Sequence, residues 1–340
     1  MRVLLVKLSS LGDLIHCLPA LTDAKRARPE IRFEWVVEEA FTEIPPLHPT
    51  VETVIPAALR RWRGRWRPAW AAGAPQAFVR ALRERRYDLI LDAQGLIKSA
   101  VVARLARGPV AGFDARSARE PLAALGYGRR YRVPRAAHAV TRLRHLFAAA
   151  LGYPLPEDPP DFGLPPLGRP VAADRPYLIF VHATTWSSKA WPARRWAELT
   201  RLATEAGYAV RLPWYAPGER LEAERIVAQA GGGELLPRLG LRELAAELGS
   251  AAGTVAVDTG LAHLAAALGT PGVSLYGASD PRLTGAVGRE QIRLATDLPC
   301  VPCGRRRCTH PEASPGHPPC LDRLPAERVW TALRERLRPL

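Results

Sequence analysis

Residues 257–271 read VDTGLAHLAAALGTP, and this stretch decides how the chain is interpreted. The apolar run that ends at Val257 is typical of a buried strand, and the alanine-rich pattern after it predicts a helix. Asp258, Thr259 and Gly260 lie at the junction between the two. A helix N-terminus carries unpaired N–H groups and a positive dipole end, so it attracts anions. We therefore expect a nucleotide diphosphate here, with Asp258 and Thr259 capping the helix and contacting the ligand.

The same alternation of strands and helices extends outward through the rest of the chain. In the first half, the pattern predicts strands at 3–7, 32–37, 51–55 and 87–93 and helices at 14–24 and 97–107. In the second half, it predicts strands at 178–182, 209–212, 235–236, 255–257 and 273–276 and helices at 193–206, 220–231 and 325–340. Strands that alternate with helices form parallel βαβ units. The fold class is therefore α/β, with two similar halves.

A proline-rich stretch separates the two halves. Eight prolines fall within residues 153–176, where the hydrophobic pattern has no period. Because proline restricts the backbone, we interpret residues 156–176 as a semi-rigid linker. The predicted domains are 1–155 and 177–324, followed by a C-terminal helix at 325–340. Ligands tend to bind in the cleft between such domains.

Composition narrows the class of protein. The chain has 340 residues, of which 47% are hydrophobic and 24% charged, as in globular proteins. Its longest apolar runs are too short to cross a bilayer. Lys7 and Asp13 interrupt the N-terminal apolar stretch, which a signal peptide would keep uncharged. We therefore expect a cytoplasmic location, in which the five cysteines need not form disulfides.

The net charge of +15 comes mostly from arginine, because only four of the 48 basic residues are lysine. Part of this excess reflects a general preference for arginine on the surface. A local patch stands out in residues 60–67, where five arginines are interleaved with Trp62 and Trp66. Such a patch suits an anionic surface or substrate. A nucleic-acid-binding protein would also be basic, but that class leaves residues 258–260 and Lys189 unexplained.

Two loops that follow predicted strands carry the other candidate residues. Asp13 follows the first strand, and it is either a helix cap or a general base that takes a proton from a sugar hydroxyl. The loop lacks the G-x-G-x-x-G pattern of a dinucleotide site, which argues against a dehydrogenase. In the second half, Thr184 and Thr185 offer hydroxyl groups, and Lys189 offers a point charge for phosphate. Glu219 is placed to accept hydrogen bonds from sugar hydroxyls.

The last candidates are His263 and the cysteines. A lone histidine on an apolar helix is usually a core residue, but its place beside residues 258–260 favours ligand contact. Cys300 and Cys303 have the C-x-x-C spacing of zinc ligands. With Cys308 and Cys320 they form either a structural zinc site or a set of reduced, redox-labile thiols. Cys17 is interpreted as a core residue.

Together these stretches resemble the ADP-heptose lipopolysaccharide heptosyltransferases, and most of all their type I members. The resemblance extends over nearly the whole chain, and the matching stretches follow one another in the same order as in that family. They are KLSSLGDLIHCLPALTDA, WVVEEAF, IPAALRRWR, DAQGLIKSA and VDTGLAHLAAAL. It implies a GT-B architecture, with two Rossmann-like domains facing a cleft and a C-terminal helix crossing back. The cysteine-rich segment is more like the type II members, so a type II enzyme or a related ADP-sugar transferase acting on a later core acceptor stays open.

The resemblance also implies a reaction. It is the inverting transfer of L-glycero-D-manno-heptose from ADP-heptose to a Kdo residue of Kdo2-lipid A, without a cofactor or a catalytic metal. The expected partners are these two substrates and the anionic inner-membrane surface, with no nucleic acid. The expected location is peripheral, on the cytoplasmic face of the inner membrane.

The resemblance further implies a role for each matching residue. The catalytic residues are Asp13, as the base, and Lys189. The donor-binding residues are Thr184, Thr185, Lys189, Glu219, Asp258, Thr259, Gly260 and His263. The acceptor-binding residues are Arg60, Arg61, Arg63, Lys98, Arg119, His138 and Arg142.

Overall fold

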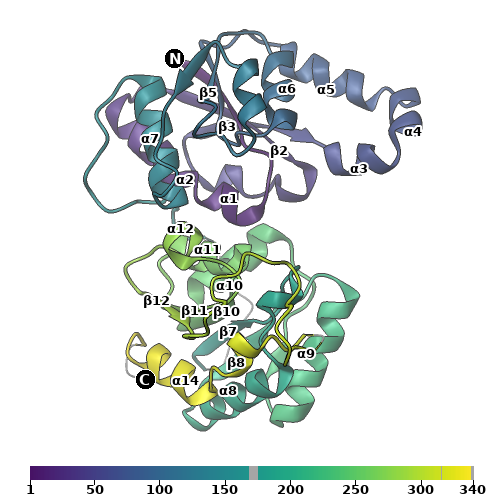
Figure 1. Cartoon of the computed structure of the whole chain (residues 1–340), viewed down its shortest axis with the longest axis vertical. Helices are drawn as coiled ribbons and strands as arrows, with labels where there is room; N and C mark the ends of the chain where they lie inside the picture. The colour runs from purple at the N-terminus through teal and green to yellow at the C-terminus, as the bar shows by residue number, and fades with distance from the viewer. Residues whose placement is uncertain (168–174, 315, 338–340) are drawn as a thin grey trace. The chain divides into compact units, whose positions relative to one another are not determined.

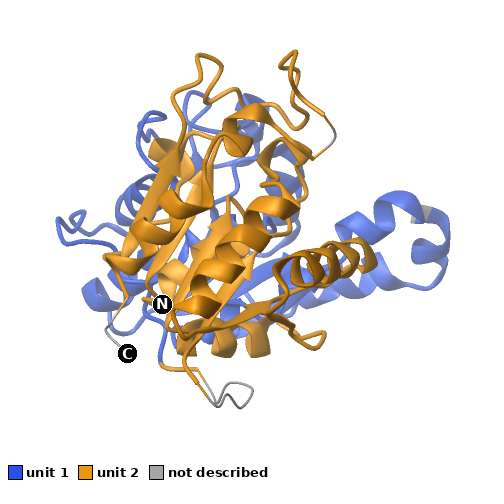
Figure 2. Ribbon diagram, turned by 90° about the horizontal axis from the view of Figure 1, so that it is seen from below, with its two compact units in different colours: residues 1–165 blue, residues 166–340 orange. Residues whose placement is uncertain are grey.

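The computed structural model describes residues 1–167, 175–314 and 316–337, and it describes Trp66 by its backbone alone. The chain divides into two compact units, Met1–Pro165 and Pro166–Leu340, coloured blue and orange in Figure 2. The division falls inside the linker predicted at 156–176, of which residues 168–174 lie outside the described residues. Each unit is an α/β structure with a parallel sheet, as predicted.

The first unit, drawn in purple to teal in Figure 1, contains a parallel sheet. This sheet has six strands in the order β3-β2-β1-β4-β5-β6. Its strands are β1 (Arg2–Val6), β2 (Arg32–Glu38), β3 (Val51–Ala57), β4 (Leu89–Asp92), β5 (Val110–Phe113) and β6 (Arg129–Tyr131). Its α-helices are α1 (Leu11–Ile15), α2 (Leu18–Ala27), α3 (Leu59–Gly64), α4 (Trp66–Ala71), α5 (Ala74–Arg83), α6 (Ile97–Leu105) and α7 (Ala139–Leu151). Its 3-10 helices are η1 (Glu39–Phe41), η2 (Pro45–Leu47) and η3 (Pro121–Gly126).

The second unit repeats the arrangement with a parallel sheet in the order β12-β11-β10-β7-β8-β9. Its strands are β7 (Tyr177–Val181), β8 (Ala209–Leu212), β9 (Glu234–Leu235), β10 (Gly253–Val257), β11 (Gly272–Tyr276) and β12 (Gln291–Ala295). Its helices are η4 (Ser187–Lys189), α8 (Ala193–Glu205), α9 (Pro217–Ala230), α10 (Leu241–Ser250), α11 (Gly260–Ala267), α12 (Pro281–Thr284), α13 (Pro319–Asp322) and α14 (Ala326–Arg334).

The strand orders locate the ligand-binding edges. In each sheet the chain winds first to one side and then to the other, so the order reverses between two central strands: β1 and β4 in the first sheet, β7 and β10 in the second. In open α/β sheets, ligands bind outside the carboxyl ends of the strands at this reversal. The loops after these four strands carry Asp13, Gln94, Lys189 and Asp258, respectively.

The cores explain why these elements form. Strands β4, β7 and β10 are buried along their whole length, as expected for central strands covered on both faces. In the second unit, Trp191 and Trp196 pack edge to face with ring centroids 4.9 Å apart beneath α8. Each sheet is therefore held by apolar side chains buried within its own unit.

The helix predicted at residues 14–24 is two helices, and the prediction of one continuous helix is wrong. Helix α1 ends at Ile15, and α2 begins at Leu18 with Pro19 in its first turn. Proline has no N–H, and its ring clashes with the carbonyl of the fourth residue before it, here Ile15. Cys17 lies at the break and is fully buried, as predicted.

The segment after α7 packs onto the first unit. Arg144 of α7 forms a buried ion pair with Asp23 of α2, with Nε 2.6 Å from Oδ2. Its guanidinium also donates to the Asp158 carbonyl at 2.9 Å. Phe162 is buried as well. The proline-rich stretch as far as Pro165 is therefore anchored to helices α2 and α7 by named contacts.

The last described helix, α14, belongs to the second unit. It packs against α8 and against strands β10, β11 and β12. Trp330 packs edge to face on Tyr208, with ring centroids 6.2 Å apart. The helix predicted at 325–340 is thus observed over Ala326–Arg334. Residues 338–340 of that prediction lie outside the described residues.

Candidate functional site

The loop after β1 places Asp13 at the carboxyl edge of the first sheet. Asp13 lies in the first turn of α1, and Ser10 caps this helix. The Ser10 N–H and hydroxyl donate to Asp13 Oδ2 at 2.9 and 3.1 Å, so the helix-cap role suggested by the sequence is present. The other oxygen, Oδ1, faces Lys7, and 33% of the Asp13 side chain is exposed. The carboxylate therefore stabilises its helix and keeps a surface that a substrate can reach.

Lys7 controls the charge of this carboxylate. Its ammonium lies 3.5 Å from Asp13 Oδ1 and donates to the Ala93 carbonyl at 3.1 Å, while its side chain is almost fully buried. Burial alone raises the pKa of Asp13, but the Lys7 charge, the Ser10 N–H and the His16 charge outweigh burial and lower the pKa to about 2. Sequence analysis missed Lys7. The rarity of lysine, which drew attention to Lys189, applies equally to this residue.

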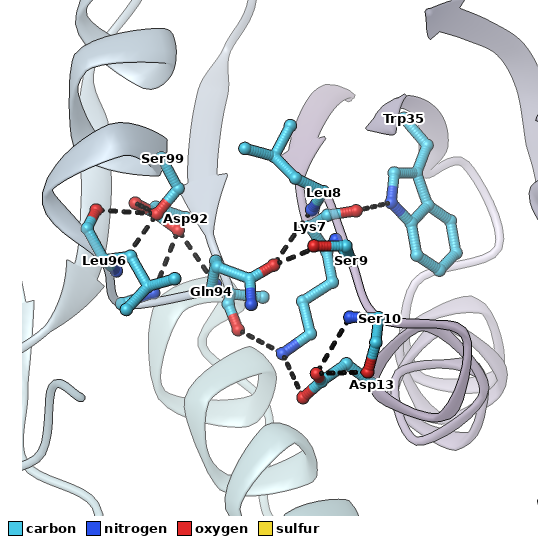
Figure 3. Close-up of polar contacts among 12 residues, drawn as sticks. Lys7, Leu8, Ser9, Ser10, Asp13, Trp35, Asp92, Gln94, Leu96 and Ser99 are labelled. Carbon is cyan, nitrogen blue, oxygen red and sulfur yellow. Dashed lines mark hydrogen bonds and ion pairs between the residues drawn. The ribbon is translucent and has the colours of Figure 1, made fainter. Parts of the chain in front are cut away.

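Gln94 holds the backbone that leads to Asp13. Figure 3 shows the Gln94 side chain directed at the loop after β1, where its Oε1 accepts the N–H groups of Leu8 and Ser9 at 3.0 and 3.3 Å. Gln94 itself follows β4, and Asp92 Oδ1 accepts its N–H at 2.8 Å. The turns after the two central strands are therefore tied to each other.

Asp92 is the buried centre of this arrangement. Its Oδ2 accepts hydrogen bonds from the Ser99 and Tyr127 hydroxyls at 2.8 and 2.7 Å, and Oδ1 also accepts the Gly95 N–H at 3.2 Å. The side chain is fully buried, and burial raises the pKa of this carboxyl against the effect of these hydrogen bonds. Asp92 therefore fixes the turn after β4 and the start of α6 and does not reach the surface.

The predicted acceptor residues follow several strands of the first sheet. The Arg60 backbone N–H donates to Glu38 Oε1 at 3.2 Å. Burial raises the pKa of Glu38, and the charges of Arg60 and Lys98 act in the opposite direction. Because Glu38 ends β2 and Lys98 lies in the first turn of α6, this carboxyl brings together two predicted residues from distant parts of the chain.

The arginine patch is helical, and its tryptophan is internal. Arg61 forms a bidentate pair with Glu39, both bonds being 3.0 Å, and Arg63 is exposed on the same helix, α3. Trp62 is buried and packs on Phe78, with ring centroids 5.6 Å apart. Trp62 is therefore a core residue, and the arginines beside it form the exposed part of the patch. The Trp66 side chain lies outside the described residues.

Three further predicted acceptor residues lie near the ends of β5 and α7. Arg119 is exposed, and its backbone lies close to Gly95 in the turn after β4. His138 caps α7 by accepting the Val140 N–H, and its ring lies 5.6 Å from the ring of His16 at the end of α1. The Arg142 guanidinium donates to the Ser117 carbonyl at 2.6 Å. Burial lowers the pKa of Arg142, and Arg135 adds to this effect.

In the second unit, Asp258 is the centre of a charged cluster after β10. Lys189 Nζ donates to Asp258 Oδ2 at 2.6 Å, and His263 Nε2 lies 3.6 Å from Oδ1. The Ser279 hydroxyl donates to the same carboxylate. Burial alone raises the pKa of Asp258, but the His263 hydrogen bond and the Lys189 charge outweigh it and hold the pKa well below its usual range. Sequence analysis predicted three of these residues and missed Ser279.

Of the two residues expected to cap α11, Thr259 is the N-cap residue, in an extended conformation. No side-chain hydrogen bond caps the helix. The Asp258 carboxylate turns instead to Lys189, which provides a full positive charge. This leaves the first-turn N–H groups of α11, at Gly260 and the next residues, without a side-chain cap.

The loop after β7 is supported by the cysteine-rich segment. Thr184 Oγ1 accepts the Trp186 N–H at 3.4 Å, and Thr185 is exposed. The Lys189 ammonium lies 4.4 Å from the centroid of the Trp186 ring. Ser188 donates through its hydroxyl to the Arg305 carbonyl at 2.6 Å. The neighbouring Arg306 guanidinium lies 5.4 Å from the same Trp186 ring, a second cation that sequence analysis missed.

Glu219 has a structural task that the sequence prediction did not include. It lies in the first turn of α9, where Oε2 accepts the N–H groups of Tyr215 and Ala216 at 2.8 and 3.1 Å. The Glu219 carbonyl is hydrogen-bonded to His182 Nε2 at 3.0 Å. The residue therefore links the loops after β7 and β8, and its contact with a donor sugar stays a prediction.

The four cysteines from 300 to 320 line one small cavity together with Ser188 and His310. Burial raises the pKa of Cys320 to about 11, and the other three thiols act in the same direction. Within residues 1–167, 175–314 and 316–337, no group of three or more His, Cys, Asp or Glu side chains is arranged to hold a metal ion. The two alternatives for these thiols, zinc ligands or free thiols, stay predictions that metal analysis of the purified protein decides.

Comparison with known proteins identifies the class. Residues 76–313 match the model of glycosyltransferase family 9 (heptosyltransferase). A relative from Pseudomonas aeruginosa, lipopolysaccharide heptosyltransferase 1, is 50% identical over 99% of this chain and 98% of its own length. The chain therefore belongs to glycosyltransferase family 9 and is a glycosyltransferase.

Solved structures agree with this assignment. The E. coli heptosyltransferase WaaC with ADP is 42% identical, with a TM-score of 0.85 over 99% of this chain and 100% of its own. The same enzyme with ADP-2-deoxy-2-fluoro heptose has a TM-score of 0.83 over 98% of this chain and 99% of its own. The expected α/β fold class is confirmed, with a Rossmann-like parallel sheet in each unit. Among the described helices, none is both long and apolar enough to span a bilayer.

Proposed function

We propose that this protein transfers L-glycero-D-manno-heptose from ADP-heptose to a Kdo residue of Kdo2-lipid A in lipopolysaccharide core synthesis. The observation that carries the proposal is the combination of two half-sites at the reversal points of two sheets. One presents a charged, partly exposed carboxylate, Asp13, and the other presents a buried Lys189–Asp258 pair beside the start of α11. Support also comes from the relative named lipopolysaccharide heptosyltransferase 1.

The second half-site suits a diphosphate leaving group. Asp258 holds the Lys189 ammonium in place, and the uncapped N–H groups at Gly260 add further positive potential. As ADP leaves the anomeric carbon, negative charge grows on the oxygens of its diphosphate. Donors that are already fixed in place stabilise that charge without having to reorganise. Thr184, Thr185 and His263 complete the proposed donor contacts. Transfer proceeds in this proposal without a catalytic metal.

The first half-site suits activation of the acceptor hydroxyl. Asp13 accepts the proton of the attacking Kdo hydroxyl as its oxygen bonds to the anomeric carbon and the bond from that carbon to the diphosphate breaks. The hydroxyl attacks from the side opposite to the departing ADP, so this single displacement inverts the anomeric carbon. The arginines of α3 together with Lys98, Arg119, His138 and Arg142 are proposed to bind the carboxylates and phosphates of the acceptor. In this proposal the base belongs to the first unit and the donor-binding residues belong to the second.

We also propose a peripheral location at the cytoplasmic face of the inner membrane. The acceptor is a lipid in this proposal, and the chain carries a net charge of +15, which favours an anionic bilayer surface.

The decisive experiment is a transfer assay with purified protein, ADP-heptose and Kdo2-lipid A, with the product identified by mass. We expect the acceptor to gain the mass of one heptose. A parallel assay uses an acceptor that already carries one heptose. Transfer to the second acceptor alone would replace the proposal with a type II enzyme, and no transfer to either would refute it.

A further inference from the structure

Four large apolar side chains are exposed on two neighbouring elements of the first unit. On α6, Ile97 and Val101 are 45% and 55% exposed, and on η3, Leu122 and Leu125 are 65% and 73% exposed. Residues four apart share a face of an α-helix, and residues three apart eclipse in a 3-10 helix. Helix α6 and η3 pack against each other. We call these four side chains the α6–η3 patch.

The charges around the α6–η3 patch are mostly positive. Lys98 and Arg104 are exposed on α6, Arg119 is exposed just before η3, and Arg129 is exposed just after it. The nearby carboxylate, Glu120, accepts the Ile97 N–H at 2.7 Å and so is occupied at the start of α6. Apolar side chains together with surrounding cations suit the interface of an anionic bilayer. The apolar side chains contact the acyl chains, and the cations contact the lipid phosphates.

We propose that the α6–η3 patch is the surface through which this protein docks on an anionic lipid bilayer. The proposal rests on the proposed function, in which the acceptor is a lipid, and it adds the surface that meets the lipid. Lys98 follows Ile97 directly in the chain, and Arg119 comes shortly before Leu122. Both are also proposed acceptor contacts, so docking is proposed to bring the acceptor headgroup close to the residues that bind it. The surface differs from the arginine patch of α3, whose Trp62 is internal.

The test uses sedimentation with vesicles of phosphatidylcholine, with and without phosphatidylglycerol, in the absence of substrates. The wild type is expected to bind the anionic vesicles, and added salt to weaken the binding. The double variant Leu122→Ser/Leu125→Ser is expected to bind at least about tenfold more weakly, since several buried methylene groups are lost. The matched control is Leu221→Ser on α9, because Leu221 is 64% exposed in the second unit.

Each result of this test is informative. Binding of the double variant equal to that of wild type overturns the proposal, as does a wild type that ignores anionic vesicles. The patch could instead bind a second copy of the chain, and sedimentation velocity without vesicles tests this. A wild-type dimer that the double variant no longer forms would assign the patch to dimerisation. Activity on a deacylated, water-soluble acceptor should be unchanged in the double variant. If the wild type transfers no heptose in the assay with ADP-heptose and Kdo2-lipid A, the proposed function is refuted. The vesicle experiment uses no substrates, so its result still decides the docking proposal.

A separate observation carries a second inference, which concerns Gln94. One side-chain oxygen accepts two consecutive backbone N–H groups, those of Leu8 and Ser9, in the loop that presents Asp13 (Figure 3). Gln94 is buried, and its own turn is fixed by the fully buried Asp92. The loop after β1 has therefore little freedom to move relative to the end of β4.

The geometry assigns Gln94 as a positioning residue for the base Asp13. It does not touch the substrate in this proposal, and it acts by fixing the backbone that carries the carboxylate. A displacement of about 1 Å at a reacting group can cost roughly 100-fold in rate. Gln94→Met removes the accepting oxygen at similar volume and is expected to lower kcat about 10- to 100-fold, with the KM for ADP-heptose within about twofold of wild type.

The test is a double-mutant cycle with Asp13→Ala. If Gln94 acts through Asp13, Gln94→Met lowers kcat in the wild-type background and has no further effect in Asp13→Ala. Gln94→Glu keeps side-chain oxygens that accept both N–H groups, so it is expected to retain most of the wild-type kcat. Gln94→Asn is shorter by one methylene and does not reach these N–H groups, so its kcat is expected to fall as in Gln94→Met. The matched control is Gln291→Met, which removes a side-chain bond to the Thr270 carbonyl in the second unit.

The outcomes separate this inference from the proposed function. An Asp13→Ala enzyme with normal turnover refutes the base assignment itself. An impaired Asp13→Ala with an unaffected Gln94→Met overturns the inference alone, and so does an equal loss from Gln94→Met in both backgrounds. Melting temperatures of all variants identify unfolding. If Gln94→Met does not fold, the comparison of Gln94→Glu with Gln94→Asn decides.

Discussion

The Asp13 carboxylate is controlled by one buried lysine. Lys7 is nearly inaccessible and is held between Asp13 and the Ala93 carbonyl. A positive charge next to a base keeps it ionised but also weakens it as a proton acceptor. In the second unit the roles are reversed, because the Asp258 carboxylate holds Lys189, the lysine proposed to bind the diphosphate. Each half-site thus contains a Lys–Asp contact, and the proposed catalytic residue is the aspartate in the first unit and the lysine in the second.

The effect of Lys7 appears in the pH profile. Lys7→Met removes the charge that lowers the pKa of Asp13, while the burial that raises it remains, so this pKa rises. The base is then protonated at a higher pH, and the acidic limb of kcat/KM for the acceptor moves to higher pH. A matched control is Lys25→Met, since Lys25 also donates to a backbone carbonyl, that of Pro29, in the same unit. An acidic limb that stays in place contradicts the role given to Lys7.

At the scale of elements, α3 presents cations on a helix whose inner face is packed. Trp62 anchors α3 on Phe78, so the arginines lie on the opposite, exposed side. Figure 1 shows α3, α4 and α5 as a run of helices extending from one side of the first sheet. Arg61 is already paired with Glu39, which leaves Arg63 better placed for an anionic acceptor.

Charge reversal on α3 tests this assignment. Arg63→Glu is expected to raise the acceptor KM about tenfold or more, because a charge-assisted contact becomes a repulsion, and to leave the ADP-heptose KM unchanged. Arg61→Glu also breaks the pair with Glu39, so part of its effect is structural. Arg83→Glu, on α5, is the control. Steady-state kinetics in both substrates provide the readout, and an unchanged acceptor KM for Arg63→Glu removes α3 from the acceptor site.

Helices α2 and α7 are joined by a buried ion pair that the sequence did not reveal. Arg144→Met leaves the Asp23 carboxylate buried without its partner, which typically costs about 3–5 kcal/mol in the free energy of unfolding. Arg225→Met breaks an exposed pair with Glu222 and is expected to cost less than about 1 kcal/mol. Denaturant unfolding followed by circular dichroism measures both. Equal stabilities of the two variants would contradict the structural role of Arg144.

At the scale of the whole molecule, acid should destabilise the protein through specific carboxylates. The pKa values of Asp13 and Asp258 are lowered in the folded state, against about 3.9 for an unfolded aspartate. Groups with lowered pKa contribute stability that is present above the unfolded pKa and is lost as pH falls through the folded pKa. Stability should therefore fall below about pH 4.

Asp258→Asn isolates one of these contributions. The variant leaves Lys189 without its counter-charge and is expected to lose roughly 1–3 kcal/mol at neutral pH. The difference from wild type should shrink as pH falls below about 4, because the carboxylate of the unfolded wild-type chain then takes up a proton while the folded one stays ionised. Melting temperatures over a pH series provide the measurement. A difference that stays constant with pH would show that the Asp258 charge is not what stabilises the fold.

The sequence alone determined the α/β class and the two parallel sheets, and it indicated Asp13, Lys189 and Asp258 as separate candidates. These features are local, because hydrophobic period, turn residues and short motifs lie within a few residues of one another. Helices α3 to α5 were not predicted, because the sequence around Arg63 has no clear hydrophobic period. The buried face of α3 becomes recognisable only once Trp62 is known to lie in the core.

Tertiary structure alone decided which groups face each other across the sheets. Lys7 reaches the Ala93 carbonyl, and Gln94 reaches Leu8, only because β1 and β4 are neighbours, although 86 positions separate the two residues of each contact. In the same way, Lys189 meets Asp258 because β7 pairs with β10. Strand order is set by the packing of whole elements, so no local pattern encodes these partners.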